Sequence, residues 1–307
     1  MQGYAFAQAY PSKPVRFIVT FPPGGSADLM ARALAPGLSS RLGQQVIVEN
    51  RPGAGGNLGM EVLAKSAPDG HTVGLGAAGA LSANVSLYPN MPFNPEKDLA
   101  PVSMVAMIPF FLVANPGAPF SDLRQLLSSE KAKTGGIAYG HGGNGSAMHL
   151  CGELLNLKAG LKLQAIAYKG SGPVATDVLG GQVPLGFVDV PSSIANVRAG
   201  KLRALAVTTR ERVSAAPEVP TFAEAGLPGY EAIGWFGMVV PAATPRGVIE
   251  RLNRAVVESL AVPEFRERAI AVGAEPQGST PQEFAAFIHA EIGKWAEVIK
   301  AAKVTID

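Results

Sequence analysis

The stretch VRFIVTFPPGGSADLMAR, residues 15–32, decides the fold class. It begins as a β-branched run typical of a buried strand, turns at 22–25 and continues with a helical pattern. Such a corner directs glycine N–H groups and the positive end of a helix dipole at one point, which suits an anion. Residues 21–29 contain no lysine or arginine, so this corner would bind through neutral hydrogen bonds. Taken alone, the stretch is equally compatible with a plain connection.

Strand-like and helical segments alternate after this corner. Strands at 45–49 and 72–76, with helices at 27–42 and 57–66, give a βαβαβ order. That order predicts a parallel sheet with helices on both faces. The alternation of strand-like and helical segments begins again near residue 121, so we expect two doubly wound α/β units.

Two extended segments connect these units, near 107–112 and 236–240. The protein is therefore predicted to have two lobes joined by a hinge. The first lobe would comprise residues 10–111 and 239–307, including three C-terminal amphipathic helices, and the second lobe residues 112–238. The last helix carries an apolar stripe that is expected to pack in the core.

The composition disfavours several functional classes. A net charge of +2, with dispersed basic residues, disfavours a nucleic-acid surface. No apolar run approaches the ~20 residues of a membrane span. No Walker A sequence is present, and residues 22–26 of the first corner, PPGGS, do not form Gly-x-Gly-x-x-Gly, so a nucleotide fits this corner poorly. Cys151, the single cysteine, is expected to be a buried, unreactive thiol.

Glycine-rich corners recur where expected strands pass into helices, at residues 21–28, 76–84, 139–146 and 168–172. Ligands of open parallel sheets bind beyond the carboxyl ends of the strands. Two of the corners belong to each lobe, so they could face each other across a cleft. Their arrangement predicts a small-ligand site between the lobes.

No catalytic or metal-binding set is recognisable. Ser26 lacks the Gly-x-Ser-x-Gly frame of a nucleophile, so we expect it to cap a helix or bond a ligand, and Asp28 to cap the turn. His141 and His149 have no cysteine partners, which disfavours a metal site. His149 would contact a ligand, cap or pack, and Asp189 would face the cleft or cap the next helix. We therefore expect a protein that is not an enzyme and needs no metal or cofactor.

Residues 5–9, Ala-Phe-Ala-Gln-Ala, have the small-x-small pattern that precedes signal-peptidase cleavage. We interpret residues 1–9 as the remnant of a signal peptide behind an added methionine. The mature chain would then begin near Tyr10 and be exported.

Short motifs continue along the chain: YPSKP at 10–14, FPPGG at 21–25, VENRPGAGG at 48–56, PDGHT at 68–72, YKG at 168–170, GKLRALAVT at 200–208, PEVPT at 217–221 and PGYE at 228–231. In number, order and spacing they resemble the Bug/TctC family of extracytoplasmic solute-binding proteins, the capture components of tripartite tricarboxylate transporters. The resemblance implies a bilobal periplasmic-binding-protein fold of the Venus-flytrap, type II-like class, and a periplasmic location. It also implies a small carboxylate ligand, such as a dicarboxylate or an aromatic carboxylate, and transporter membrane subunits as partners. We expect a monomer.

In that family one ligand carboxylate is held by the first-lobe corners, through backbone amides, hydroxyls and ordered water. The resemblance assigns this role to Phe21, Gly24, Gly25, Ser26, Asp28, Ala77, Ala78 and Gly79. The second lobe would close with Gly142, Ser146, His149, Tyr168, Lys169 and Asp189. His141 stands where relatives usually carry a small polar residue, a departure that bears on ligand preference.

Two other functions fit an α/β chain of this kind. An enzyme acting on a small carboxylate would need a nucleotide fingerprint or a nucleophile–base pair, and neither is recognisable. A ligand-sensing protein that feeds a signalling system would need a DNA-binding segment or a basic face.

Overall fold

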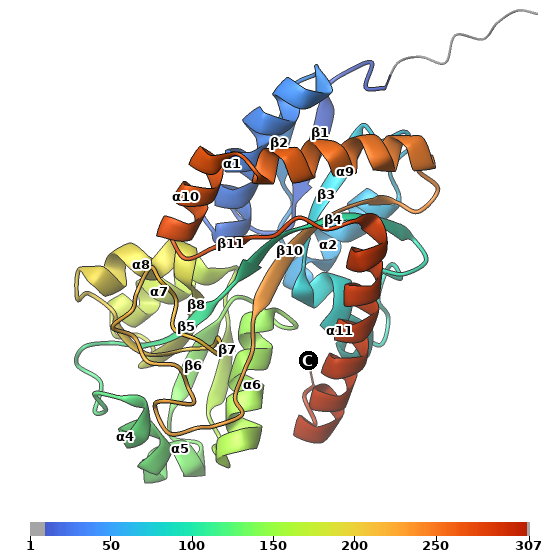
Figure 1. Ribbon diagram of the computed structural model, residues 1–307. Coiled ribbons are helices and arrows are strands. Elements are labelled where there is room, and N and C mark those ends of the chain that lie inside the picture. The colour runs from blue at the N-terminus through green and yellow to red at the C-terminus, as the bar shows by residue number, and fades with distance from the viewer. Residues whose placement is uncertain (1–9, 306–307) are drawn as a thin grey trace, which may run out of the picture.

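Two α/β lobes, each built around one sheet, make up the protein in a computed structural model that describes residues 10–305 (Figure 1). The expected signal remnant, residues 1–9, lies outside the described residues. The first-lobe sheet has the strand order β11-β4-β10-β3-β1-β2. Its strands are β1 (Val15–Val19), β2 (Val46–Asn50), β3 (Thr72–Ala77), β4 (Leu99–Ile108), β10 (Gly234–Pro241) and β11 (Glu275–Pro276).

The second-lobe sheet has the order β7-β6-β8-β5-β9. Its strands are β5 (Phe110–Ala114), β6 (Ala138–His141), β7 (Gln164–Ala167), β8 (Leu185–Asp189) and β9 (Arg203–Val207). The expected α/β fold with two sheets is confirmed, but the sheets are mixed and not purely parallel. β10 runs antiparallel to β3 and β4, and β5 runs antiparallel to β8 and β9. The strands that lead from one lobe to the other are the ones that break the parallel pattern.

Helices cover both faces of the first sheet. They are α1 (Ser26–Leu42), α2 (Asn57–Ala64), α3 (Asn84–Leu87), α9 (Arg246–Leu260), α10 (Pro263–Ala271) and α11 (Pro281–Ala302). Alternation along β1 sends Phe17 to the core beneath α1 and α9, and Ile18 to the core shared by α2 and α11. The α11 stripe packs as expected, with Phe284 and Trp295 fully buried. Within α1, Met30 packs in the core, whereas the neighbouring Leu29 is 45% exposed.

The second lobe carries α4 (Leu123–Ser128), α5 (Glu130–Thr134), α6 (Ala147–Ala159), α7 (Ser171–Leu179) and α8 (Val190–Arg198). Tyr139 and Phe187 pack in the core under α6, whereas Val174 and Val188 belong to the core under α7 and α8. Cys151 of α6 is a buried free thiol, and burial raises its pKa to about 12.

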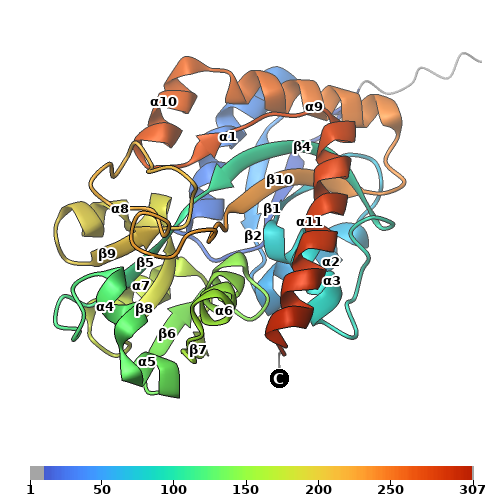
Figure 2. The same ribbon diagram turned by 60° about the horizontal axis from the view of Figure 1, so that its bottom comes forward.

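The chain passes from the first sheet to the second at Pro109, between β4 and β5. It returns before Gly234, because β10 pairs with first-lobe strands over its whole length. This crossing lies a few residues earlier than the 236–240 segment expected from the sequence. Helix α11 packs on β4 in the first lobe and also contacts α6 in the second, as Figure 2 shows. Among the described residues, no helix has both the length and the apolar character required to cross a bilayer.

Candidate functional site

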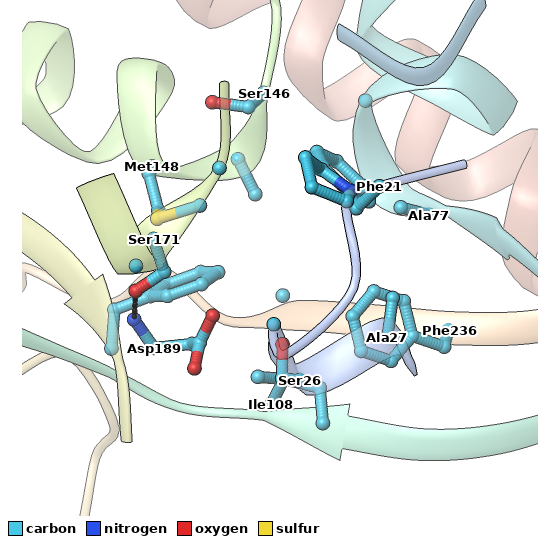
Figure 3. A pocket seen from close by; sticks show the side chains of 18 of the residues that line it. Phe21, Ser26, Ala27, Ala77, Ile108, Ser146, Met148, Ser171, Asp189 and Phe236 are labelled. Carbon is cyan, nitrogen blue, oxygen red and sulfur yellow. Dashed lines mark hydrogen bonds between the residues drawn. The ribbon is translucent and has the colours of Figure 1, made fainter. Parts of the chain in front are cut away.

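A cavity of about 270 Å³ lies between the lobes, next to the hinge (Figure 3). The first lobe contributes the corner after β1 and the end of β3. The second lobe contributes the starts of α6 and α7 and the end of β8, and hinge strands close the base. The lining residues are Phe21, Pro22, Pro23, Gly24, Gly25, Ser26, Ala27, Ala77, Ala78, Gly79, Ile108, Phe110, Ser146, Ala147, Met148, Lys169, Gly170, Ser171, Gly172, Pro173, Thr176, Asp189, Gly234, Trp235 and Phe236.

Three helices begin at this cavity: α1 from the first lobe, and α6 and α7 from the second. Gly25 precedes α1 and Gly170 precedes α7, and neither supplies a side-chain cap. The first amides of both helices therefore remain available to a ligand. Because the positive ends of three helix dipoles meet here, the cavity favours a negatively charged group.

Asp28 holds the shape of the first corner and does not line the cavity. Its carboxylate accepts hydrogen bonds from the Gly24 N–H at 3.0 Å, from Arg32 Nε at 2.9 Å and from Asn50 Nδ2 at 3.0 Å. Burial raises its pKa, but the bonds from Arg32, Gly24 and Asn50 outweigh burial and lower the pKa overall. The left-handed residue of the corner is Gly24, with φ +84°, whereas Gly25 is extended with φ −79°.

Within the part of the chain that the structure describes, Asp189 is the single acidic residue of the cavity lining. It ends β8 and caps α8, since its Oδ1 accepts from the Ser192 N–H at 2.9 Å and from the Ser192 hydroxyl at 2.5 Å. Its own N–H donates to Ser171 Oγ at 3.0 Å. Burial raises the pKa of this carboxyl, and the nearby hydroxyls of Ser192, Ser26 and Ser171 offset only part of the increase. Asp189 therefore both caps α8 and lines the cavity, the two roles that were alternatives in the sequence.

A second cavity of about 260 Å³ adjoins the first, with Phe21, Pro22 and Lys169 shared between them. Residues 52–56 and Tyr88 form its first-lobe wall, and residues 142–144 and 167–169 form its second-lobe wall. Gly142 and Tyr168 belong to this cavity and not to the main one.

The lobes touch through the loop 142–146, here called the latch loop. Tyr88 of the first lobe donates its hydroxyl to Asn144 O at 3.0 Å. A Cβ on Gly79 would overlap Gly145 O, and a Cβ on Gly145 would overlap Asn84 Oδ1. The backbones can approach this closely only because both positions are glycine.

Two stacked histidines support the latch loop from within the second lobe. The rings of His141 and His149 have centroids 4.4 Å apart and planes inclined by 21°. His141 Nδ1 accepts from the Gly143 N–H, and His149 Nδ1 from the Gly145 N–H, each at 3.3 Å. Burial lowers the pKa of His141 to about 3, assisted by the neighbouring His149, and lowers that of His149 to about 4. Both rings are therefore neutral at pH 7.

The structure thus separates the expected site residues into three groups. Phe21, Gly24, Gly25, Ser26, Ala77, Ala78, Gly79, Ser146, Lys169 and Asp189 line the main cavity. Gly142 and Tyr168 line the adjoining cavity, and Asp28 and His149 line neither of the two. The apolar lining residues Ile108, Phe110 and Met148 were not expected from the sequence, because Ile108 and Phe110 come from the strands that connect the lobes and not from glycine-rich corners. Trp235 and Phe236, for which the sequence left hinge packing and ligand stacking open, also line the cavity.

The described lining residues offer hydroxyls, Lys169 and the Asp189 carboxylate to a ligand. Hydroxyls of Ser26, Ser146, Ser171 and Thr176 reach the lining, whereas none of the residues described there is a histidine or cysteine. Nowhere in residues 10–305 do three or more His, Cys, Asp or Glu side chains gather in a way that could hold a metal ion.

Comparison with known proteins agrees with this architecture. Residues 30–304 match the family model described as the tripartite tricarboxylate transporter family receptor, TctC. Protein BugT of Bordetella pertussis is 42% identical over 295 residues, which cover 96% of this chain and 90% of BugT. The structure of Rpa4515 from R. palustris with adipate is 34% identical, with a TM-score of 0.92, covering 96% of this chain and 99% of that one. MatC (Rpa3494) from Rhodopseudomonas palustris with bound malate is 32% identical, with a TM-score of 0.89, covering 94% and 100%. The chain therefore belongs to the Bug/TctC family of tripartite tricarboxylate transporter receptors.

Proposed function

We propose that this protein is a periplasmic receptor that captures a small carboxylate for a tripartite tricarboxylate-type transporter. The observation that carries the proposal is the cavity between the lobes, where three helix N-termini converge. Two of these helices begin without side-chain caps, so their first amides are free for an anion. Family membership and the adipate and malate bound to relatives support the same ligand class.

Capture would proceed by closure of the lobes. The ligand carboxylate would lie against the amides of residues 24–27 and 77–79, and Ser146, Lys169 and Asp189 would approach from the second lobe. A ligand that contacts both lobes favours the closed state by its additional contacts there. Hinge bending would occur at Pro109 and in the segment just before Gly234, where the chain changes sheets. We propose that the protein acts as a monomer and passes the ligand to membrane subunits unchanged.

A thermal-shift screen tests the ligand class. Small carboxylic acids should raise the melting temperature, because a ligand that binds only the folded state adds RT ln(1 + [L]/Kd) to its stability. The corresponding primary amides have nearly the same shape but no charge, and they should have little effect. Equal shifts by acids and amides would contradict anion recognition by helix ends.

Mass spectrometry of the recovered ligand tests the absence of turnover. The acid should be returned chemically unchanged after prolonged incubation. Conversion beyond one equivalent, abolished by Ser26→Ala, would instead support an enzyme acting on a small carboxylate.

A further inference from the structure

The side-chain amide of Asn84 lies directly beneath the latch loop. Asn84 begins α3 and follows a turn of π-helix, η2 (Gly79–Ala83), whose first residue lines the main cavity. The residue has an exposed fraction of 0%. Its Nδ2 donates to Oδ1 of Asn57, also in the first lobe, at 2.7 Å. The amide is therefore fixed within the first lobe, with its oxygen against the second.

The Asn84 oxygen meets carbon, and not a donor, on the second lobe. A Cβ on Gly145 would overlap Asn84 Oδ1, so the Gly145 Cα covers this oxygen. Among residues 10–305 no donor pairs with Asn84 Oδ1. An amide oxygen that loses water without gaining a donor costs more free energy than a typical hydrogen bond contributes. Closure of the latch loop therefore carries a cost at Asn84, because lifting the loop would return the oxygen to water.

A neighbouring contact favours closure. Tyr88 follows α3 directly and donates its hydroxyl to Asn144 O at 3.0 Å. Asn84 and Tyr88 thus touch adjacent residues of the latch loop, and the two contacts act in opposite directions. The free energy of closing the loop is a balance between them.

Resting on the capture by lobe closure proposed above, we propose that Asn84 holds the ligand-free protein open. Its oxygen is hydrated while the latch loop is lifted and loses that water on closure, and a bound ligand supplies the free energy that closure requires. Asn84 lines neither cavity, so it acts through the latch loop as a positioning residue. Because the apparent Kd rises as the fraction of binding-competent protein falls, Asn84 also limits the affinity of the site.

Two substitutions at Asn84 should change ligand affinity in opposite directions. Asn84→Ala removes the oxygen, so the ligand-free protein should become more compact in small-angle scattering. Its Kd for adipate or malate, the acids bound to the two relatives, should fall about 5-fold or more in calorimetry. Asn84→Asp places a carboxylate beneath the latch loop, so the ligand-free protein should stay as extended as the parent and the Kd should rise about 10-fold or more. Damage to the fold alone would weaken binding in both variants.

Asn84→Ala also removes the hydrogen bond to Asn57 inside the first lobe, and Asn253→Ala is the control for such a loss. Asn253 Nδ2 donates to Val102 O at 2.7 Å and to Ser279 O at 2.8 Å, all within the first lobe. Its replacement should leave compactness and Kd unchanged. Asn84→Ser, which shortens the side chain and withdraws its oxygen from the latch loop, should act like Asn84→Ala and replaces it if the alanine protein does not fold.

The outcomes separate the two proposals. The role of Asn84 is refuted if the ligand-free parent already scatters as this structure does, if Asn84→Ala is no more compact than the parent, or if both Asn84 variants weaken binding. A water molecule retained beneath the closed latch loop would give such a result, because the oxygen would then keep a partner. Carboxylate binding is unaffected by any of these results. If neither adipate nor malate binds, scattering of the ligand-free proteins decides the role of Asn84, and the thermal-shift screen decides the proposed function.

Discussion

The stacked pair of His141 and His149 should make the protein sensitive to mild acid. Each ring accepts a backbone N–H at Nδ1, so protonation at that atom would break a hydrogen bond that supports the latch loop. Their exposed fractions are 0% and 4%, and a charge on either ring would be desolvated. The nearest acidic group is Glu153, 3.9 Å from His149 Nε2, and Tyr139 donates its hydroxyl to that same carboxylate. Lowering the pH from neutral should therefore destabilise the folded protein.

The direction and size of the stability change follow from the pKa values of the two histidines. An ordinary histidine has a pKa of 6.5, whereas these two have folded-state values of about 3 and about 4. The unfolded chain therefore binds more protons below pH 6.5, and stability that is complete above that pH is lost as the pH falls. Between about pH 7.5 and about pH 5 each ring should cost about 2 kcal/mol, or roughly 4 kcal/mol for the pair. Asp189, whose pKa is raised, acts in the opposite direction, so variants must be compared with the parent protein.

Urea unfolding of the ligand-free protein at several pH values measures the effect. In the variant carrying His141→Asn and His149→Asn, the amide oxygen of asparagine can replace Nδ1 as the acceptor. The free energy of unfolding of this variant should therefore depend much less on pH between about pH 7.5 and about pH 5. His289→Asn is the control, since that exposed ring pairs with Glu96 and the slope should persist. Proton NMR gives a direct check, because the two buried rings should not titrate between about pH 8 and about pH 5. Titration of both near pH 6.5, or an unchanged slope in the double variant, would refute the reasoning.

Three further predictions concern the cavity and the core. Gly79→Ala should raise the ligand Kd about 10-fold or more by blocking contact with the latch loop. Gly293→Ala, in α11, has free space and lies outside the cavity lining, so it should leave the Kd unchanged; calorimetry on both variants decides it. Gly25→Val should also weaken ligand binding about 10-fold. Lys169→Met should raise the ligand Kd less than about 5-fold, because the Lys169 side chain is exposed. A larger effect of Lys169→Met than of Gly25→Val would contradict recognition by backbone amides. The Cys151 thiol, with its pKa raised to about 12, should resist alkylation in the native protein at mildly alkaline pH and react once the chain is unfolded; rapid native labelling would show that the thiol is accessible.

Local sequence patterns predicted the parts of the fold that depend on local chemistry. The β-branched run before Pro22 and the helical pattern after Ser26 form β1 and α1, and the stripe of α11 packs as its spacing indicates. The antiparallel placement of β10 was not predictable in this way. Its eight residues are all buried, and a continuous apolar run fits a parallel or an antiparallel neighbour equally well. Pairing with β3 and β4 is decided by where the chain returns from the second lobe, which is a property of the whole molecule.

In the candidate site, too, some residues could be assigned from the sequence and others required the structure. The glycine-rich corner before α6 predicted where backbone amides meet the cleft, and Ser146 does line the main cavity. It could not predict which side chain of the first turn points there. Successive residues of a helix are rotated by about 100°, so Met148 faces the cavity while His149 turns inward onto His141. Which of these side chains faces the cavity depends on where α6 begins, at the Ser146 cap, and on the buried ring of His141 at the end of β6. Only the folded lobe specifies both. Side chains at a helix start therefore need the structure for their assignment, whereas the backbone groups beside them can be assigned from sequence.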